Sequence, residues 1–434
     1  MKVAVVGTGY VGSVTATCLA SLGCDVTGLD VDAARAEQLS AGQVPFYEPG
    51  LSELLTSVRA TRRLRFTSDE REALASADVA FVCVGTPEGE GGRPDLRALR
   101  AAAVAIARHL HRGEVVVTKS TVPVGSGNWM RSTIEDAAPR DVGFSIVSNP
   151  EFLREGSAIS DFLRPDRIVL GGDPDGIDRV LELYRPLLDV EEPPPVLRMD
   201  LPSAEMVKYA SNVALATKIS LANELSDLCS ATGADARAVL SAVGADARIG
   251  PAFLRPGLGW GGSCLPKDVA AMIAMGAEYS TPTPLLEAAR TVNDARIERL
   301  VHVLQRELKA MQGRRIALLG LTFKPCTDDL RASPALALAS RLVEGGSVVT
   351  AYDPVIKSVA GADGVRIRAD AYEAADRADA VVVATKWPEF STLDLSVLAE
   401  RMRGDLILDA RSALPAERAR AAGLRLLEIG APAA

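Results

Sequence analysis

Side chains suited to covalent chemistry are concentrated in residues 257–268, which read Gly-Leu-Gly-Trp-Gly-Gly-Ser-Cys-Leu-Pro-Lys-Asp. Four glycines within six positions are costly to order, which indicates that the backbone must approach something closely. Pro266 is typical of a first helical turn, so Cys264 should lie at or just before a helix N-terminus. The helix dipole and Lys267 would both favour the thiolate, and Asp268 would follow one turn later on the same face. We therefore predict that Cys264 is a nucleophile rather than a small buried hydrophobic residue.

A lysine on a predicted helix is the second candidate. Glu205, Lys208 and Asn212 are spaced i, i+3 and i+7, so they share one stripe, and their apolar flanks indicate a partly buried face. Only 9 of the 48 basic residues are lysines, which makes a lysine inside a motif less expected as a surface residue. We predict that Lys208 stabilises a developing oxyanion. The competing interpretation is a solvated stripe with a surface lysine.

Residues 7–12 predict a dinucleotide site, because Gly-Thr-Gly-Tyr-Val-Gly directly follows an apolar strand and opens a helix. The glycines permit a tight turn, close approach of a pyrophosphate and close helix packing, and the helix N-terminus supplies N–H donors. Asp30 ends the next strand, where its carboxylate would bind a ribose diol and repel a 2′-phosphate, with Arg35 as a partial offset. We predict NAD rather than NADP. An α/β turn that binds no cofactor is the alternative.

Other polar residues follow predicted strands, and open α/β sheets bind ligands at the carboxyl ends of their strands. Thr86 and Thr121 should therefore line the cofactor crevice, unless each hydroxyl only caps a turn. Residues 149–156 also follow a predicted strand and carry two acids and an arginine, which makes them candidate site residues. The other interpretation is a loop whose charges are exposed to solvent. Lys324 and Arg331 follow the first strand of the last region, where they would hold phosphate or hydroxyl groups of a second ligand.

The composition limits the class of protein. The 434 residues carry a formal charge of −8 with dispersed basic residues, which argues against binding a nucleic-acid polymer. Three histidines without HxxH or HExxH spacing predict no metal site. No apolar run approaches the ~18 residues of a membrane span, and the chain opens on a strand without a signal-cleavage pattern. Six cysteines without CxxC pairing are typical of reduced thiols, so we expect a cytoplasmic protein.

The elements that must position these residues change in type twice along the chain. Residues 1–200 alternate β-branched runs with helical stretches, which predicts a parallel sheet covered on both faces. Residues 203–229 contain no Gly or Pro and predict one long helix that ends before Gly233, followed by a helical segment to about Met311. From Gly313 the βαβ alternation returns. The expected strands are Val3–Val6, Val26–Leu29, Val79–Val84, Val115–Lys119, Phe144–Val147, Arg167–Leu170, Ile316–Leu319, Val348–Ala351, Ala380–Ala384 and Leu406–Leu408.

The last region repeats the first in sequence. Residues 2–7 (Lys-Val-Ala-Val-Val-Gly) match residues 315–320 (Arg-Ile-Ala-Leu-Leu-Gly), and residues 26–30 (Val-Thr-Gly-Leu-Asp) match 349–353 (Val-Thr-Ala-Tyr-Asp). The expected fold is α/β, with two Rossmann-like, doubly wound parallel-sheet domains joined by a long central helix and a helical middle domain. The expected boundaries are 1–200, 201–312 and 313–434. Two unrelated α/β domains are the alternative.

Seven ordered motifs resemble the UDP-glucose/GDP-mannose dehydrogenase family along essentially the whole chain. They are GTGYVG at 7–12, VGTP at 84–87, STVPVG at 120–125, NPEFLREG at 149–156, EMVKYASN at 205–212, GWGGSCLPKD at 259–268, and LTFKP with TDDLR at 321–331. The resemblance implies a four-electron oxidation of the C6 alcohol of a nucleotide sugar to a carboxylate with two NAD. The implied path passes through an aldehyde, a cysteine thiohemiacetal and a thioester that water hydrolyses.

The resemblance also implies a set of site residues. The catalytic set is Cys264, Lys208, Asp268, Asn212, Thr121, Glu151 and Glu155, with Asp268 associated with a water and Glu151 with the hydrolytic step. Cofactor contacts, together with those of the dinucleotide motif, are Gly7, Gly9, Tyr10, Val11, Gly12, Asp30, Arg35, Thr86, Thr121, Glu155, Lys267 and Arg331. Substrate contacts are Glu151, Phe152, Leu153, Arg154, Lys208, Asn212, Phe253, Arg255, Gly257, Gly261, Cys264 and Lys324.

The implied partner is a nucleotide sugar, with UDP-glucose expected, bound by the C-terminal domain while the N-terminal domain binds NAD and the central helix forms a homodimer. GDP-mannose and dTDP-glucose are alternative substrates, because Arg255 and Cys326 depart from the residues usual in the family near the sugar nucleotide. Two other functions compete with this one. A two-electron 2-hydroxyacid-type dehydrogenase would leave Cys264 idle, and a nucleotide-sugar-binding protein would have no catalytic role.

Overall fold

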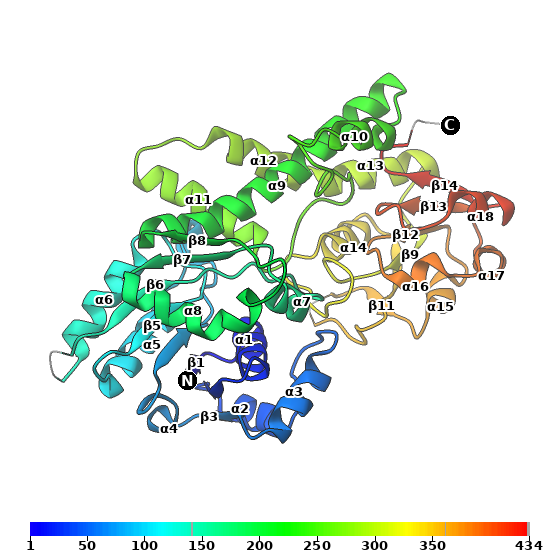
Figure 1. Cartoon of the computed structure of the whole chain (residues 1–434). Helices are drawn as coiled ribbons and strands as arrows, with labels where there is room; N and C mark the ends of the chain where they lie inside the picture. The colour runs from blue at the N-terminus through cyan, green and yellow to red at the C-terminus, as the bar shows by residue number, and fades with distance from the viewer. Residues whose placement is uncertain (140–141, 361, 432–434) are drawn as a thin grey trace. The chain divides into compact units, whose positions relative to one another are not determined.

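The computed structural model describes residues 1–139, 142–360 and 362–431, which divide between two compact units, Met1–Ser211 and Asn212–Ala434. Each unit contains one β-sheet, and α9 (Leu201–Thr232) begins in the first unit and ends in the second (Figure 1). The elements of the first unit are β1 (Lys2–Val6), α1 (Tyr10–Ser21), β2 (Asp25–Leu29), α2 (Ala33–Ser40), α3 (Leu51–Ala60), β3 (Leu64–Thr67), α4 (Glu70–Leu74), β4 (Val79–Val82), the short 3-10 helix η1 (Glu90–Gly92), α5 (Arg97–His109), β5 (Val115–Thr118), α6 (Ser126–Ala137), β6 (Ser145–Ser148), α7 (Ala158–Leu163), β7 (Ile168–Gly172), α8 (Pro174–Leu188) and β8 (Val196–Met199).

The second unit begins with helices and ends in an α/β domain. Its elements are α10 (Ala236–Gly244), α11 (Leu265–Glu278), α12 (Pro284–Asp294), α13 (Arg296–Leu308), β9 (Arg315–Leu319), α14 (Pro334–Glu344), β10 (Val348–Tyr352), β11 (Val365–Ile367), α15 (Ala371–Ala375), β12 (Ala380–Val383), α16 (Pro388–Ser391), α17 (Leu395–Arg401), β13 (Leu406–Asp409), α18 (Ala416–Ala421) and β14 (Arg425–Glu428). As predicted, residues 203–229 lie in one long helix, α9, which has Pro202 in its first turn and ends directly before Gly233, whose φ of 78° suits a helix C-terminus.

The first sheet has eight strands in the order β3-β2-β1-β4-β5-β6-β7-β8. Successive side chains of β1 face opposite layers of the core. Val3 and Val5 pack in the cluster that includes residues of α1, α3 and α8, whereas Ala4 and Val6 pack in the cluster with residues of α5 and α6. Helices therefore cover both faces, as the continuous apolar strands predict.

One expectation about this sheet is wrong. The strand predicted at Arg167–Leu170 corresponds to β7, which pairs antiparallel with β6, while β8 pairs parallel with β7. Two successive strands can pair in parallel only if the connection between them carries the chain back to the end of the sheet at which the first strand began. Residues 149–167 do not make that return, and β7 starts near the end at which β6 stops.

The second sheet has six parallel strands in the order β11-β10-β9-β12-β13-β14. Its two faces are covered in the same way, by α13 and α14 on one side and by α15, α17 and α18 on the other. Four strands were not expected from the sequence, namely β3 and β8 in the first sheet and β11 and β14 in the second. All four are edge strands.

The sequence repeat between the two sheets is also a repeat of hydrogen bonds. Asp30 follows β2 and accepts from the Thr8 N–H (2.8 Å), and Asp353 follows β10 and accepts from the Leu321 N–H (2.8 Å). At the other end of the strands, Asp78 accepts from the Lys2 N–H and Asp379 from the Arg315 N–H, both at 2.8 Å. In each domain the aspartates thus hold the start of the first strand and the turn that follows it.

One buried carboxyl group lies at the N-terminal end of a strand, away from the carboxyl ends at which ligands are expected. Glu114 precedes β5, is 1% exposed, and its Oε1 has no hydrogen-bond partner in the described parts of the chain. Burial raises the pKa of Glu114 to about 8, with Asp78 adding to the shift and the His111 N–H opposing it.

Glu114→Gln should make the fold more stable at alkaline pH. A carboxyl whose pKa is raised on folding stabilises the folded state most below its unfolded value of 4.5, and this contribution is lost as the pH rises through about 8. The melting temperature of the variant should exceed that of the wild type near pH 9, and the difference should shrink toward pH 5. Parallel melting curves of the two proteins across this range would contradict the prediction.

Candidate active site

The turn between β1 and α1 has the geometry that a pyrophosphate needs. Gly7 has a φ of 89°, and its N–H donates to the Leu29 carbonyl at 2.8 Å, which closes the turn against β2. A Cβ on Gly12 would lie 1.8 Å from the Gly7 carbonyl oxygen, so only glycine fits there. A Cβ on Gly9 would meet no atom within 4 Å among the described residues, and no side chain caps α1. Open space therefore adjoins a helix N-terminus, which suits a phosphate.

Asp30 is fixed at the position expected to bind the ribose. Its Oδ2 accepts from the Thr8 N–H and hydroxyl, its Oδ1 accepts from the Asp32 N–H, and Arg35 lies 3.3 Å away. Burial would raise the pKa of Asp30, but these hydrogen bonds and the guanidinium outweigh it and hold the pKa below its usual value. The next residue, Val31, is 98% exposed and was not expected from the sequence to contribute. It offers an apolar surface beside the ribose position.

Glu48 connects the dinucleotide helix to residues 149–156. Its buried carboxylate accepts from the Tyr10 hydroxyl (2.5 Å) and from the N–H groups of Gly156 (2.5 Å) and Ala158 (2.8 Å). Burial, then Glu48 and then Glu155, raise the pKa of Tyr10, so Glu155 lies near this hydroxyl. Glu48 carries no motif signal of its own, and the sequence analysis did not find it.

Hydrogen bonds join the segments that follow β4 and β5. The Thr86 hydroxyl donates to the Thr121 carbonyl at 2.6 Å, and the Ser120 hydroxyl donates to the Val84 carbonyl at 2.7 Å. Glu205 of α9 binds the end of the same segment, accepting from the Gly125 and Gly127 N–H groups at 2.6 Å each. Burial raises the pKa of Glu205 to about 7, against the effect of these two N–H donors.

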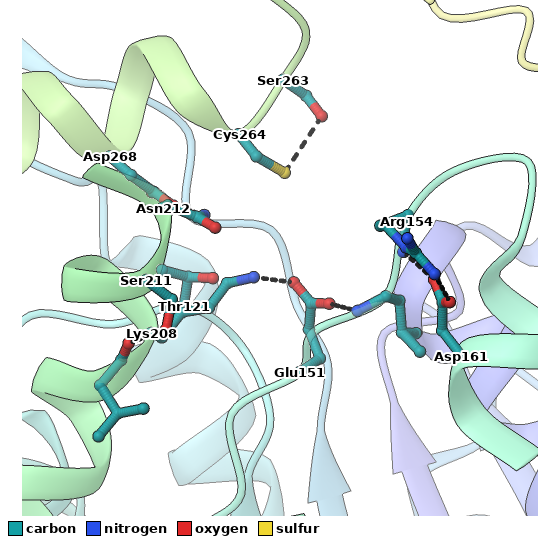
Figure 2. A network of polar contacts seen from close by, with 12 residues as sticks. Thr121, Glu151, Arg154, Asp161, Lys208, Ser211, Asn212, Ser263, Cys264 and Asp268 are labelled. Atoms are coloured by element: carbon teal, nitrogen blue, oxygen red, sulfur yellow. Dashed lines mark hydrogen bonds and ion pairs between the residues drawn. The ribbon is translucent and has the colours of Figure 1, made fainter. Parts of the chain in front are cut away.

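Lys208 forms a buried ion pair (Figure 2). Its Nζ lies 2.8 Å from Glu151 Oε1, and the two residues are 5% and 6% exposed. The Leu153 N–H donates to the other carboxylate oxygen. Burial would raise the pKa of Glu151, but Lys208, the Leu153 N–H and Lys119 outweigh it and keep the pKa below its usual value. The expected stripe of Glu205, Lys208 and Asn212 is therefore a buried one rather than a solvated one.

The remainder of residues 149–156 is held in place by charged neighbours. Arg154 binds Asp161 through its guanidinium and through its backbone N–H, which lies 2.8 Å from Oδ2 (Figure 2). The Arg167 guanidinium lies 3.9 Å from the centroid of the Phe152 ring. The segment is thus an ordered loop whose two acids, Glu151 and Glu155, are buried or half-buried.

Cys264 lies where the proline and glycine pattern predicts. It is the N-cap of α11, it is exposed, and its sulfur lies 3.6 Å from the Ser263 hydroxyl (Figure 2). One turn later Asp268 is 1% exposed, and its carboxylate accepts from the Asn212 side-chain amide and pairs with Lys267. A cysteine, an acid, an amide and a lysine thus share the first turn of one helix and its contact with α9.

The backbone at the glycines before Cys264 packs closely against other segments of the same unit. A Cβ on Gly261 would lie 2.1 Å from the Ala332 carbonyl oxygen, and one on Gly262 would lie 2.7 Å from the Phe323 ring. The Gly257 carbonyl accepts from Arg296 at 2.7 Å. The predicted close approach is therefore confirmed, and its partners are the loop after β9 and helix α13.

The remaining expected contact residues, Phe253, Arg255 and Lys324 for the substrate and Arg331 for the cofactor, lie in the second unit. Phe253 is 38% exposed and adopts a φ of 64°, a strained conformation that presents its ring to solvent. Arg255 is exposed, and Lys324 lies 5.5 Å from the Phe323 ring centroid. The Arg331 guanidinium donates two hydrogen bonds to Asp329, and the Arg331 N–H donates a third.

Arg411 is a residue that the sequence analysis missed. It follows β13, and its guanidinium donates to the Ala384 carbonyl at 2.9 Å. Burial lowers the pKa of Arg411 to about 10, and a Cβ on Gly257 would lie 3.2 Å from this guanidinium. A half-buried cation at the carboxyl ends of the second sheet's strands suits an anionic ligand.

Two negative findings apply to the residues that the structure describes. Within 1–139, 142–360 and 362–431, no three or more His, Cys, Asp or Glu side chains are grouped so that they could hold a metal ion. Over the same residues every helix is too short or too polar to span a bilayer.

Comparisons with known proteins cover the whole chain. Family models of the UDP-glucose/GDP-mannose dehydrogenases match residues 1–188 (NAD binding domain), 202–295 (central domain) and 317–416 (UDP binding domain). A UDP-glucose 6-dehydrogenase of Rhizobium meliloti is 43% identical over 442 residues, covering 100% of both chains. The UDP-glucose 6-dehydrogenase TuaD of Bacillus subtilis is 40% identical, covering 100% of this chain and 94% of that one.

Solved structures agree with the sequence comparisons. A UDP-glucose dehydrogenase from Pyrobaculum islandicum has a TM-score of 0.91 at 39% identity, covering 100% of this chain and 98% of that one. The fold and the dinucleotide turn define an NAD-dependent oxidoreductase with two Rossmann-like domains. Within that class, the chain belongs to the UDP-glucose/GDP-mannose dehydrogenase family.

Gly9→Ala and Gly12→Ala should separate cofactor binding from folding. Gly9 has a φ of −67° and room for a Cβ, so alanine should lower stability by at most about 1 kcal/mol while placing a methyl group where the pyrophosphate binds. Gly12→Ala should destabilise by about 1–3 kcal/mol or more, because its Cβ would overlap a carbonyl oxygen. Calorimetric titration with NAD should show at least about tenfold weaker binding to Gly9→Ala. Wild-type affinity in that variant would contradict the assignment.

Proposed function

We propose that this protein oxidises the C6 alcohol of UDP-glucose to the carboxylate of UDP-glucuronate, with two NAD per sugar. The observation that carries the proposal is an exposed cysteine at the N-terminus of α11, one turn before a buried acid. The first sheet of the same chain has a dinucleotide turn. A two-electron alcohol dehydrogenase has no use for such a thiol. An alcohol-to-acid oxidation needs one, because a covalently held aldehyde neither escapes nor stops at its hydrate.

The choice of UDP-glucose rests on the relatives. Full-length identity is 43% to the R. meliloti UDP-glucose 6-dehydrogenase and 28% to a UDP-D-ManNAc dehydrogenase structure from Pyrococcus horikoshii. A GDP-mannose dehydrogenase structure from Pseudomonas aeruginosa is 31% identical with a TM-score of 0.55. These values favour UDP-glucose over the other sugars.

The dinucleotide turn fits NAD, with Gly7, Gly9 and Gly12 at the pyrophosphate and Asp30 at the ribose. NAD, when bound, supplies the acceptor for a hydride from the substrate carbon in each of the two oxidations. The Asp30 carboxylate disfavours a 2′-phosphate, because like charges ~4 Å apart at an effective dielectric of about 20 repel by about 4 kcal/mol. Thr86, Thr121, Glu155, Lys267 and Arg331 are proposed as further cofactor contacts.

Lys208 and Asn212 are proposed to hold the C6 oxygen. A buried ammonium group stabilises negative charge that develops on that oxygen as the alcohol loses its proton. The low exposure of Lys208 supports this role, since water does not screen its charge. When no substrate is bound, the Lys208 ammonium group is paired with the Glu151 carboxylate.

Cys264 is proposed to carry the second half of the reaction. Its thiolate adds to the aldehyde carbon, forming a C–S bond as the carbonyl oxygen takes up a proton, and loss of a hydride and that proton leaves a thioester. A water then bonds to the thioester carbon while Glu151 accepts one of its protons, and the C–S bond breaks to release the thiolate and the acid. Asp268 is proposed to orient a water through the network it forms with Asn212 and Lys267.

We further propose three parts for the chain: residues 1–200 for NAD, 201–312 for dimerisation and 313–434 for the nucleotide sugar. Phe152–Arg154, Phe253, Arg255, Gly257, Gly261, Lys324 and Arg411 are the proposed substrate contacts. Exposed apolar side chains on the helical part support a homodimer, since Leu221 and Leu228 of α9 are 49% and 58% exposed and seven residues apart. We also propose a cytoplasmic location. It is supported by the proposed reaction on a nucleotide sugar, and by the cysteines, which lack CxxC pairing.

The stoichiometry of NADH tests the proposed reaction. UDP-glucose should yield two NADH per sugar, and Cys264→Ala should yield no uronate while still reducing an added UDP-sugar 6-aldehyde with NADH, which shows that the variant is folded. A panel of UDP-, dTDP- and GDP-sugars identifies the substrate. One NADH per sugar would favour the two-electron dehydrogenase, and no turnover with any sugar would favour a binding protein.

Leu228→Glu should convert a dimer into a monomer, because it places a charge on the apolar stripe of α9. Light scattering after size-exclusion chromatography measures the mass. Val397→Glu is the matched control, since Val397 is 37% exposed on α17 of the C-terminal domain and the variant should keep the wild-type mass. A wild-type monomer, or a Leu228→Glu dimer, would refute the proposed interface.

A further inference from the structure

Lys119 is a buried lysine that the reaction described so far does not use. It follows β5, is 5% exposed, and its Nζ donates to Asn149 Oδ1 at 3.1 Å. The ammonium group lies 5.8 Å from the centroid of the Phe162 ring. Among the described residues Lys119 forms no ion pair, unlike Lys208 with its carboxylate at 2.8 Å. A charge without an ion pair of its own is an expensive group to bury.

The hydrogen bond to Asn149 does not explain why a lysine is there. Asn149 Oδ1 also accepts from the Tyr184 hydroxyl at 2.7 Å, and its Nδ2 donates to the Val169 carbonyl at 2.9 Å. The amide is therefore oriented without the lysine. A methionine at position 119 would fill similar space without a desolvated charge and should not weaken the fold.

The carboxylate that interacts with the charge of Lys119 is that of Glu151. Lys119, Asn149, Glu151 and Tyr184 line a cavity of about 130 Å³, which has room for water. The other charged residues that line it are Arg154, Asp161, Arg164, Asp166 and Arg167. Glu151 and Lys208 are the charged groups that face Lys119, from the loop after β6 and from α9. The neighbouring thiols of Cys18 (α1) and Cys83 (after β4) are neutral, since burial raises the pKa of each to about 12.

Tyr184 of α8 is neutral as well, because burial raises the pKa of its hydroxyl. Glu151 thus interacts with two buried lysines, Lys208 and Lys119. Burial lowers the pKa of Lys119, whereas Glu151 favours its charged form. Each of these lysines in turn favours the charged form of Glu151.

We propose that Lys119 is a positioning residue for the hydrolytic step, which keeps Glu151 ionised while Lys208 binds the substrate oxygen. The inference rests on the proposed function. Lys208 cannot give its full charge to both the C6 oxygen and Glu151. Without another cation, burial would raise the pKa of Glu151, and a protonated Glu151 could not accept a proton from the water that attacks the thioester. The proton that Glu151 does accept then leaves toward water in the shared cavity.

Lys119→Met tests the proposal through the pH profile of kcat. The acid limb should move up by about 1–2 pH units, so that turnover near pH 6 falls about tenfold or more and recovers near pH 9. Acid quenching followed by mass spectrometry should show more thioester on the Cys264 peptide than in the wild type. The melting temperature should not fall, which separates this effect from a loss of structure.

Two further variants make the result specific. Tyr184→Phe perturbs the same Asn149 network without a change of charge, and its acid limb should stay at the wild-type pH. Lys208→Met should slow the first oxidation by about 10²–10³, the usual effect of removing a preorganised donor, without accumulating thioester. If Lys119→Met does not fold, Lys119→Gln provides the same readouts with a polar side chain.

The outcomes separate the two proposals. A wild-type pH profile and wild-type thioester level in Lys119→Met or Lys119→Gln, in an enzyme that makes two NADH per sugar, would overturn the role of Lys119 alone. A shifted acid limb in Tyr184→Phe as well would assign the effect to the network rather than to the charge. A wild-type enzyme that oxidises no sugar would overturn the proposed function instead.

Discussion

A parallel sheet has two unlike edges, and the arrangement of this chain depends on that constraint. Every crossover in the parallel part of each sheet leaves a strand at its carboxyl end, so the turns after successive strands meet along one edge. In the first sheet these turns carry Gly9 after β1, Asp30 after β2, Thr86 after β4 and Lys119 after β5. Glu151 follows β6 at the same edge. Residues up to 142 positions apart in the sequence, from Gly9 to Glu151, are collected by strand direction alone.

The central strands of both sheets could be predicted from the sequence, and the outermost strands could not. Strands such as β4 (Val-Ala-Phe-Val) and β12 (Ala-Val-Val-Val) are apolar throughout because both faces are covered. The edge strands have water on one side and are mixed in character, as in β8 (Val-Leu-Arg-Met) and β14 (Arg-Leu-Leu-Glu). The antiparallel direction of β7 was also missed, since apolar runs do not record strand direction.

The site could be predicted where a residue type acts locally, and not where its role comes from a distant partner. The N-terminal position of Cys264 followed from Pro266 two residues later, because helix capping is a local property. Glu48 contacts groups 38 and 108 positions away, and nothing within its own segment indicates them. For Lys119 a signal did exist, since it is one of only 9 lysines and directly precedes a recognised motif.

The distribution of the cysteines has a consequence for how the protein meets oxidants. Cys18, Cys24 and Cys83 lie inside the N-terminal domain, where burial raises the pKa of each thiol, and Cys229 is also buried. Peroxide and alkylating agents react with accessible thiolates, so these four of the six thiols are protected from them. Cys326 is half-buried and Cys264 is the exposed cysteine, so chemical damage is directed mainly to Cys264. A sugar held there as the proposed thioester would shield this sulfur during each turnover.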